Sequence, residues 1–379
     1  MNLDIAIVGG GLAGCSSAIR LAQKGLQVAL FEAGDYPRHK VCGEFMSHGC
    51  QMQFEALGVD EVIRDLGSNL MHQSFISTPD GTTWKATLPG TAIGISRYKL
   101  DIVLAERAKS LGTELFTQSK VVNIEGTLAH GFILSLQNRE TVQAQVVLGA
   151  YGKRSTLDKK LKRPFLNTQQ PFIGLKQHFR DLPIPDCVEL HTFTGGYCGI
   201  SQVEDGITNV CLLVREDIFR QHSQGKIDVF IDWMKQQNPF IADRLEMGIP
   251  LWNRWLSISQ VPFIQKSPIH RDIFMLGDAA GMISPLTGDG MEIALQSGEI
   301  AAKYVTDYFL NGKTSNDLIN KFCQAWNDTF HSRIQIGRVS QFFMFRPHWL
   351  KWGLRTFNTI PALGDFFIQQ TRHTDSVSM

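Results

Sequence analysis

The chain has 379 residues, of which 43% are hydrophobic, so it is long enough to bury one large core or two joined cores. Lys and Arg total 37 against 36 Asp and Glu, which leaves no global field that would attract nucleic acid or an anionic surface. No apolar run approaches the roughly 18 to 20 residues that a transmembrane helix needs. We therefore expect a globular protein with no transmembrane anchor and no nucleic acid as a partner.

Cysteine usage and the first residues bear on the cellular compartment. The seven cysteines are scattered and contain no CxxC pair, which argues against a disulfide framework and against a zinc site. The chain opens with MNLDIAIVGGG, which leaves no room for the basic and apolar regions of a signal peptide. We expect free thiols, no metal ion and a cytoplasmic location.

Apolar spacing predicts the elements of the first half of the chain. Two short apolar runs flank a segment with helical spacing, which predicts a strand, a helix and a strand over residues 3–8, 13–23 and 27–31. An irregular connection follows over 34–49. Alternation around Pro79-Asp80-Gly81 predicts a hairpin over about 71–85. We then expect a helix over 97–111 and several short strands within 121–148 that return to the first sheet.

The second half contains a different pattern. Residues 171–264 are rich in β-branched and aromatic residues and carry turn signals at 194–196 and 204–206, which predicts a second, mostly antiparallel sheet. A buried strand is predicted over 273–276, and a long helix over 289–310.

A glycine motif joins the first predicted strand to the first helix. Gly9, Gly11 and Gly14 form GxGxxG, in which a larger side chain would stop the backbone from approaching a pyrophosphate. The helix N-terminus offers free amides and a positive dipole end to the phosphates. Glu32 closes the second strand, where a carboxylate can accept both hydroxyl protons of an adenosine ribose. This pattern predicts dinucleotide binding but does not separate NAD from FAD.

A second motif separates them. Gly277-Asp278 ends a predicted buried strand, and the turn 285–290 begins a predicted helix. Here the chain resembles the FAD-dependent monooxygenase superfamily of the para-hydroxybenzoate hydroxylase fold, and in particular its geranylgeranyl reductase-like branch. The resemblance implies that Asp278 binds the ribityl chain and that Pro285, Gly288 and Gly290 face the pyrimidine edge of the flavin. A helix N-terminus there would stabilise anionic reduced flavin. The alternative is a glycine-rich capped helix whose Asp caps a turn.

Two further segments match this family in order along the chain. Arg97, with Asp101 and Leu104, resembles its R-x-x-x-D-x-x-L helix, which implies that Arg97 approaches the FAD phosphates. The segment VLGAYGKRS resembles its third fingerprint, but Tyr151 replaces an Asp that is tied to NADPH use in the hydroxylases. We expect NAD(P)H as an external electron donor, with direct reduction by bound NADPH in doubt.

The loop Tyr36 to Glu44 reads YPRHKVCGE and resembles the PRxKxCGE segment of reductases that act on prenyl chains. The resemblance implies that Cys42 lies near the isoalloxazine ring, where a thiol can shape the pocket, donate a proton or merely pack. No WxWxIP motif is present, which disfavours halogenation. His178, in the strand-like segment 173–179, is either a substrate-positioning group or a structural histidine.

The segment 331–372 interleaves basic and aromatic residues. Its only acid is Asp365, and its cations are Arg333, Arg338, Arg346, Lys351, Arg355 and Arg372. Three interpretations are open: an amphipathic segment on a membrane surface, a lid over an apolar pocket, or a helical cap with solvated Arg side chains.

Together these features predict an α/β fold. We expect a Rossmann-type FAD-binding domain (1–70, 95–170 and 270–310), an inserted β-sheet substrate domain (71–94 and 171–269) and a helical C-terminal region (311–379). We expect an FAD-dependent oxidoreductase, either a monooxygenase or an alkene reductase, acting on an apolar lipid-, isoprenoid- or polyketide-like substrate. The alternative is a non-catalytic redox sensor that binds FAD.

Overall fold

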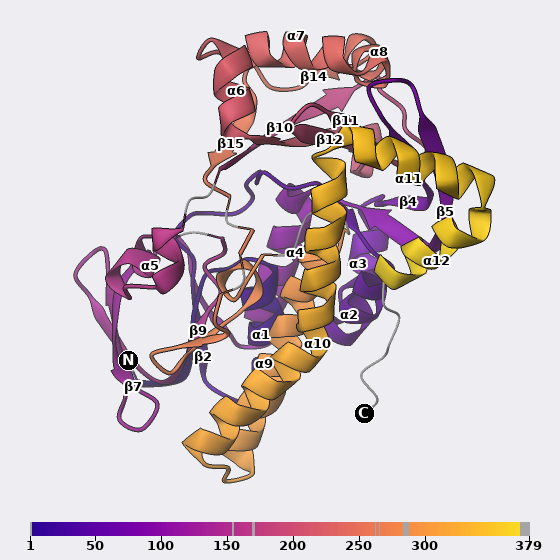
Figure 1. The fold of residues 1–379 in the computed structure, drawn as a ribbon. Helices are drawn as coiled ribbons and strands as arrows, with labels where there is room; N and C mark the ends of the chain where they lie inside the picture. The colour runs from indigo at the N-terminus through magenta and orange to yellow at the C-terminus, as the bar shows by residue number, and fades with distance from the viewer. Residues whose placement is uncertain are drawn as a thin grey trace.

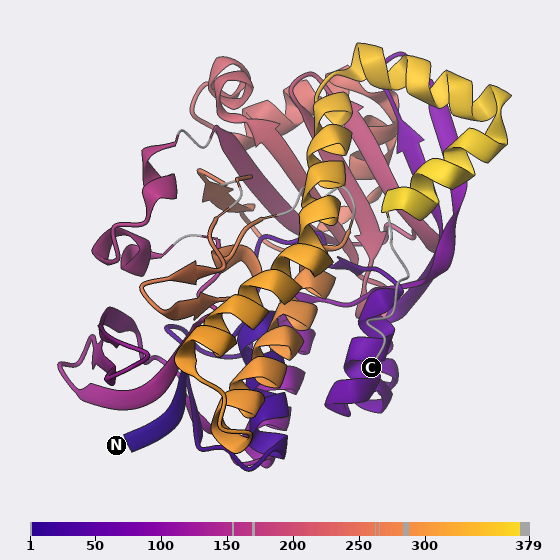
Figure 2. The same cartoon turned by 60° about the horizontal axis from the view of Figure 1, so that its bottom comes forward.

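Two β-sheets organise the chain, and helices cover both of them (Figures 1 and 2). The computed structural model describes residues 2–153, 155–168, 171–261, 263–264, 266–282 and 288–371. This mixed α/β architecture confirms the predicted fold class. All seven cysteines are free, as their scattered spacing predicts.

The first sheet is mostly parallel, in the order β16-β17-β9-β1-β2-β6, with β7 and β8 beside β9. Its central strand β1 is fully buried at Ile5, Ala6 and Ile7, which explains its continuous apolar sequence. The strands are β1 (Asn2–Val8), β2 (Val28–Phe31), β6 (Glu114–Phe116), β7 (Val121–Thr127), β8 (Gly131–Leu136), β9 (Thr141–Gly149), β16 (Ile269–His270) and β17 (Ile273–Met275).

Helices pack closely on this sheet. The Ser16 hydroxyl of α1 donates a hydrogen bond of 2.7 Å to the Leu295 carbonyl of α9. A Cβ at Gly298 of α9 would come within 2.7 Å of the Ala13 carbonyl oxygen, so only glycine permits this approach. The helices of this half are α1 (Leu12–Gln23), α2 (Gly49–Leu57), α3 (Asp60–Asp65), α4 (Arg97–Ser110), α5 (Thr156–Lys160) and α9 (Gly290–Leu310).

The second sheet has the order β14-β10-β13-β12-β11-β4-β5-β3, and β15 pairs with β10. It is mostly antiparallel, with β11 and β4 as a parallel pair. The predicted hairpin is present as β4 and β5. The strands are β3 (Phe45–Met46), β4 (Asn69–Ser77), β5 (Thr83–Gly94), β10 (Phe172–Arg180), β11 (Asp186–Phe193), β12 (Gly196–Gln202), β13 (Thr208–Arg215), β14 (Ile249–Pro250) and β15 (Leu256–Ser259).

Three helices that we did not predict cover the outer face of the second sheet (Figure 1). They are α6 (Glu216–Ser223), α7 (Ile227–Gln237) and α8 (Pro239–Met247). The buried residues of α7 have helical spacing: Phe230, Ile231 and Met234. This spacing could have predicted the helix, but it lies inside the segment that we assigned to strands. Alternation along β13 places Leu212 against these helices and Leu213 on the opposite face.

The C-terminal region is helical. Its helices are α10 (Ser315–Met344), α11 (Pro347–Thr359) and α12 (Pro361–Thr371). Helix α10 runs beside α9 and then past the second sheet, where α11 and α12 turn back over β5 (Figure 2). None of the helices within the described ranges is long and apolar enough to cross a bilayer.

The parallel strands of the first sheet end at one edge. Val8 of β1 pairs with Phe31 of β2 and with Gly149 of β9, and Gly149 also pairs with Met275 of β17. The chain order reverses at β1, which makes this edge a topological switch point where open α/β sheets bind ligands. The residues just beyond the strand ends line one cavity: Gly9, Glu32, Ala150 and Asp278.

Candidate active site

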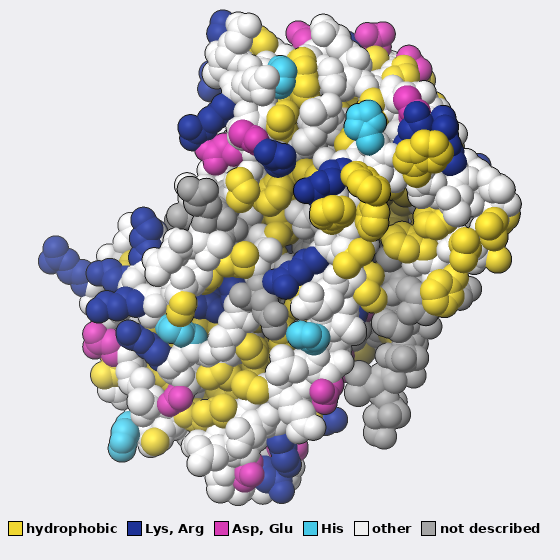
Figure 3. All heavy atoms as spheres, in the orientation of Figure 1, with side chains coloured by type: hydrophobic (Ala, Val, Ile, Leu, Met, Phe, Trp, Pro, Cys, Tyr) yellow, Lys and Arg dark blue, Asp and Glu magenta, His cyan; other side chains and the backbone are white. Residues whose placement is uncertain are grey.

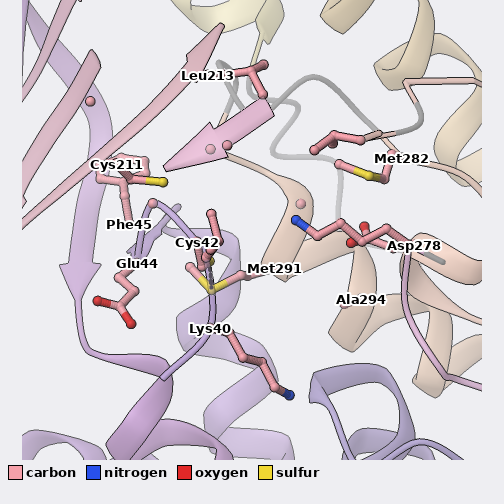
Figure 4. A pocket seen from close by; sticks show the side chains of 18 of the residues that line it. Lys40, Cys42, Glu44, Phe45, Cys211, Leu213, Asp278, Met282, Met291 and Ala294 are labelled. Carbon is pink, nitrogen blue, oxygen red and sulfur yellow. Dashed lines mark hydrogen bonds between the residues drawn. The ribbon is translucent and has the colours of Figure 1, made fainter. Parts of the chain in front are cut away.

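A cavity of about 1170 Å³ begins at this sheet edge and extends to the C-terminal helices. At one end it contacts the glycine turn after β1, and at the other it lies between the inner face of the second sheet and α10–α12. The loop that contains Cys42 lies between these two parts, with Cys42 beside Met291 of α9 (Figure 4). A single cavity therefore joins a nucleotide-like half to an apolar half.

The glycine turn has the geometry that its sequence predicts. Gly9 has a φ of +108°, and a Cβ there would come within 2.4 Å of the Ala150 carbonyl oxygen. A Cβ at Gly14 would come within 2.0 Å of the Gly9 carbonyl oxygen, so this glycine allows α1 to pack against the strand end. Gly11 lines the cavity at the N-terminus of α1, where the helix offers its free amides.

Two cations lie beside this turn. The Cβ position of Gly11 is 3.8 Å from an Arg97 guanidinium nitrogen and 3.9 Å from the Lys40 ammonium. Both cations pair with the buried Asp101, at 2.6 Å in each case. Burial works against the charge of Asp101, but Arg97 and Lys40 outweigh it and hold the pKa of this carboxyl below its ordinary value. The group carries a net positive charge, which suits a pyrophosphate. Lys40 lies in the YPRHKVCGE loop, but its sequence context did not predict that it would lie beside the glycine turn.

Glu32 lies where the second strand ends. Its carboxylate accepts hydrogen bonds from the Gly10 amide at 2.9 Å and the Gly34 amide at 2.8 Å, and it pairs with Arg38 at 2.8 Å. These contacts fix the carboxylate at the cavity wall. A carboxylate held in this way can accept hydroxyl protons from a ribose that enters the cavity.

The opposite wall of the nucleotide half carries Asp278. Its carboxylate lines the cavity and makes no hydrogen bond within the part of the chain that the structure describes, although its backbone carbonyl accepts one from Lys266 at 2.9 Å. Gly288 and Gly290, at the start of α9, line the same wall. Gly288 has a φ of +71°, and a Cβ there would come within 2.5 Å of the Phe45 ring. Pro285, the remaining residue of the predicted turn, lies outside the described residues.

The Cys42 loop is held by the second sheet. The Asn209 side chain donates hydrogen bonds to the carbonyls of Cys42 at 3.2 Å and Gly43 at 2.7 Å. The Cys42 sulfur lies 3.7 Å from the Met291 sulfur and lines the cavity, with Cys211 on the neighbouring strand (Figure 4). The loop therefore presents a thiol between the two halves of the cavity.

Glu44 closes this loop in a buried ionic cluster. Its carboxylate lies 2.5 Å from the Lys176 ammonium and 2.7 Å from His178 Nε2, and it accepts a hydrogen bond of 2.7 Å from the Arg97 amide. His178 also stacks on Trp252, with ring centroids 4.7 Å apart. The structure places His178 within this cluster rather than on the cavity wall.

Tyr151 lines the cavity where the family pattern has Asp. Its hydroxyl donates a hydrogen bond of 3.2 Å to Asp158, and burial raises its pKa well above the ordinary tyrosine value. Lys153 also lines the cavity, whereas Arg154 lies outside the described residues.

The other half of the cavity is apolar. Its walls come from the second sheet and from α10–α12, with Trp84, Tyr197, Leu213, Phe263, Met344, Leu350, Leu354 and Ile368. These side chains form a buried cluster of their own, separate from the core around the first sheet. This chamber is suited to an apolar ligand rather than a charged one.

The arrangement is that of a dinucleotide site joined to an apolar chamber. The chain matches the family described as an FAD binding domain over residues 2–325. It belongs to this family of FAD-binding, para-hydroxybenzoate hydroxylase-like flavoenzymes. It is an FAD-dependent oxidoreductase, and the residues around the cavity fit the cofactor: two cations for the pyrophosphate, a fixed carboxylate for the ribose and a second carboxylate on the far wall.

Curated relatives of the flavoenzyme span most of its length. A "conditioned medium factor receptor 1" of Dictyostelium discoideum is 23% identical and covers 90% of this chain and 71% of its own. A digeranylgeranylglycerophospholipid reductase of Methanopyrus kandleri is 24% identical, and the match covers 87% of this chain and 83% of the reductase. A menaquinone reductase of Mycobacterium tuberculosis is 22% identical, and the match covers 80% of this chain and 76% of the reductase.

Solved structures share the fold. The flavin-dependent brominase Bmp2 has a TM-score of 0.79 at 18% identity, covering 98% of this chain and 93% of its own. Further neighbours include other halogenases and PqsL of P. aeruginosa. Bmp2 and PqsL are each less than 20% identical to this chain. Similarity at this level indicates a shared fold and carries no conclusion about halogenation.

Proposed function

We propose that the flavoenzyme reduces a carbon–carbon double bond in an apolar, isoprenoid-like substrate, with NAD(P)H as the electron donor. The observation that carries the proposal is the continuity of the FAD half of the cavity with a chamber whose walls are apolar. Relatives named for the reduction of digeranylgeranylglycerophospholipid and of menaquinone support the reaction class. The YPRHKVCGE loop, between the two halves, supports it as well.

Each part of the cavity would have a distinct task. Reduced FAD, when bound, supplies a hydride for the double bond. Arg97 and Lys40 offset the pyrophosphate charge, and Glu32 holds the ribose. The positive N-terminal end of α9 stabilises negative charge nearby. Cys42 would donate a proton from its sulfur to the second carbon, so that the hydride and this proton together account for the two hydrogens added to the double bond.

Anaerobic single turnover tests the proposal. The FAD-loaded protein is reduced without oxygen, mixed with geranylgeraniol, and followed by flavin absorbance and by the mass of the product. We expect flavin reoxidation and a product that has gained two hydrogens. No reoxidation without oxygen, together with a product that gains one oxygen atom in air, would instead establish the monooxygenase. Photoreduction with no turnover of lipids or phenols would favour a redox sensor.

The role of Cys42 is tested separately. Cys42→Ala should slow reoxidation by substrate by about 10²- to 10⁴-fold, the range over which a general acid contributes. Cys323→Ala, which removes a partly buried thiol from α10, serves as the control and should react at the rate of the unchanged protein. Equal rates in all three proteins would leave Cys42 a packing role only.

A further inference from the structure

The three C-terminal helices carry apolar side chains on two faces. The inner face contributes Met344, Leu350, Leu354 and Ile368 to the buried cluster around the chamber. This face explains why the helices pack against the second sheet, but it accounts for only part of their apolar residues.

The outer face of the same helices is aromatic and exposed. Trp349 is 62% exposed, Trp352 is 64% exposed, and Phe366 is 60% exposed, with Phe342 beside Phe343 at the end of α10. Figure 3 shows hydrophobic side chains, in yellow, gathered over α11, α12 and the adjoining end of α10. We call this set the aromatic surface. Helices that only covered the core would have polar side chains on their outer face. Clusters of exposed aromatic side chains instead mark interaction sites.

The charges around the aromatic surface are mainly positive. Arg338, Arg346, Lys351 and Arg355 belong to the same helices, and Asp365 is the only acid between residues 331 and 372. The Arg346 guanidinium lies 3.9 Å from the centroid of the Phe342 ring. Lys351 and Arg355 both pair with Asp80 of the β4–β5 turn, at 2.6 and 3.8 Å, so this carboxylate offsets part of their charge. The combination of exposed aromatics and excess cations is typical of helices that lie in a membrane interface.

The apolar chamber reaches this surface. Phe343, Trp349 and Phe367 line the cavity, and yet they are 40%, 62% and 38% exposed. Side chains that are in contact with both the cavity and solvent mark its mouth. The transfer of an apolar molecule from a bilayer through water is unfavourable because water would have to solvate its apolar surface. If the mouth faces the bilayer, the molecule could enter the chamber without this cost.

We propose that the aromatic surface docks on a bilayer that contains anionic lipid and that the mouth of the chamber opens into that bilayer. The docking stands on the surface alone, whereas the entry of substrate through the mouth rests on the proposed function. The net charge of the chain is close to neutral, so any attraction to anionic lipid is local rather than a property of the whole molecule.

Vesicle sedimentation tests the docking. The FAD-loaded full chain is mixed with vesicles of equal parts phosphatidylcholine and phosphatidylglycerol, and the bound fraction is measured. Trp352→Ala combined with Phe366→Ala should lower the partition constant by about tenfold or more, from the lost apolar burial. Neither residue lines the cavity, so turnover of substrate in detergent should remain at the starting level. Loss of docking with turnover intact separates the two proposals.

A matched control uses apolar residues that are exposed elsewhere. Met52→Ala combined with Leu310→Ala removes two side chains that are 51% and 57% exposed on other helices, and it should leave sedimentation unchanged. Failure of the unchanged chain to sediment, or equal losses in both double variants, would overturn the proposal. So would a dimer without vesicles that the Trp352→Ala and Phe366→Ala changes convert to monomer, because the occupant of the aromatic surface would then be a second copy.

Discussion

The buried cluster of Glu44, Lys176 and His178 makes a strong prediction about stability. Glu44 and Lys176 are fully buried, their charged atoms lie 2.5 Å apart, and Glu44 also accepts a hydrogen bond from His178 or pairs with it at 2.7 Å. Glu44 ends the Cys42 loop with a φ of +53°, and its carboxylate accepts a hydrogen bond from the Arg97 amide. The cluster therefore joins the loop to β10 of the second sheet and to the start of α4.

Glu44→Gln tests this cluster, because it keeps the shape of the side chain and removes its charge. The ammonium of Lys176 would then be buried without a counter-ion, which typically costs about 3–5 kcal/mol. Since domains are stabilised by about 5–15 kcal/mol, a loss of this size is a large part of the total. Glu44→Gln combined with Lys176→Met removes both charges, and much of the loss should be recovered.

Urea unfolding of the single and double variants, followed by tryptophan fluorescence, measures these differences. The control is Asp205→Asn, which breaks the exposed pair of Asp205 with Lys99 and should cost about 0–1 kcal/mol. Flavin content at each urea concentration would show whether the Cys42 loop loosens before the chain unfolds. The reasoning is refuted if Glu44→Gln costs no more than the control, or if the double variant is no more stable than Glu44→Gln.

Three further predictions concern the cofactor site and its surroundings. Glu32→Ala and Asp278→Ala should each weaken FAD retention by about 1–3 kcal/mol, measured by flavin release on dilution, and unchanged retention in both would refute their assignment. Gly14→Ala should destabilise by about 1–3 kcal/mol, because its Cβ would meet a backbone oxygen at 2.0 Å. A Cβ at Gly353 of α11 would meet no atom within 4 Å, so Gly353→Ala should instead stabilise the protein by about 1 kcal/mol in thermal unfolding. A lower stability of this variant would contradict the use of these Cβ distances. Burial lowers the pKa of Lys266 to about 8 from 10.5, so the unfolded chain binds more protons between these values. Stability should therefore rise with pH across this window, and Lys266→Met should lose that rise in urea titrations.

The sequence alone determined the parts of the site that are local. The turn of Gly9, Gly11 and Gly14 and the Glu32 at the end of the second strand depend on spacing within one strand, helix and strand unit, so a short stretch of sequence specifies them. The family match confirms FAD as the cofactor and the oxidoreductase class. The division into domains and the individual site assignments stay predictions.

Only the tertiary structure decided which distant residues meet. Lys40 and Asp101 are 61 positions apart in sequence, and Glu44 and His178 are 134 apart, so their pairing depends on how the loop, α4 and the second sheet pack together. The same holds for the C-terminal helices. The sequence left a membrane segment, a lid and a cap as alternatives, and the structure shows Leu350 and Leu354 lining the chamber while Trp352 and Phe366 face outward. Composition records which residues a helix carries, but the face that each one presents is fixed by the surface against which the helix packs.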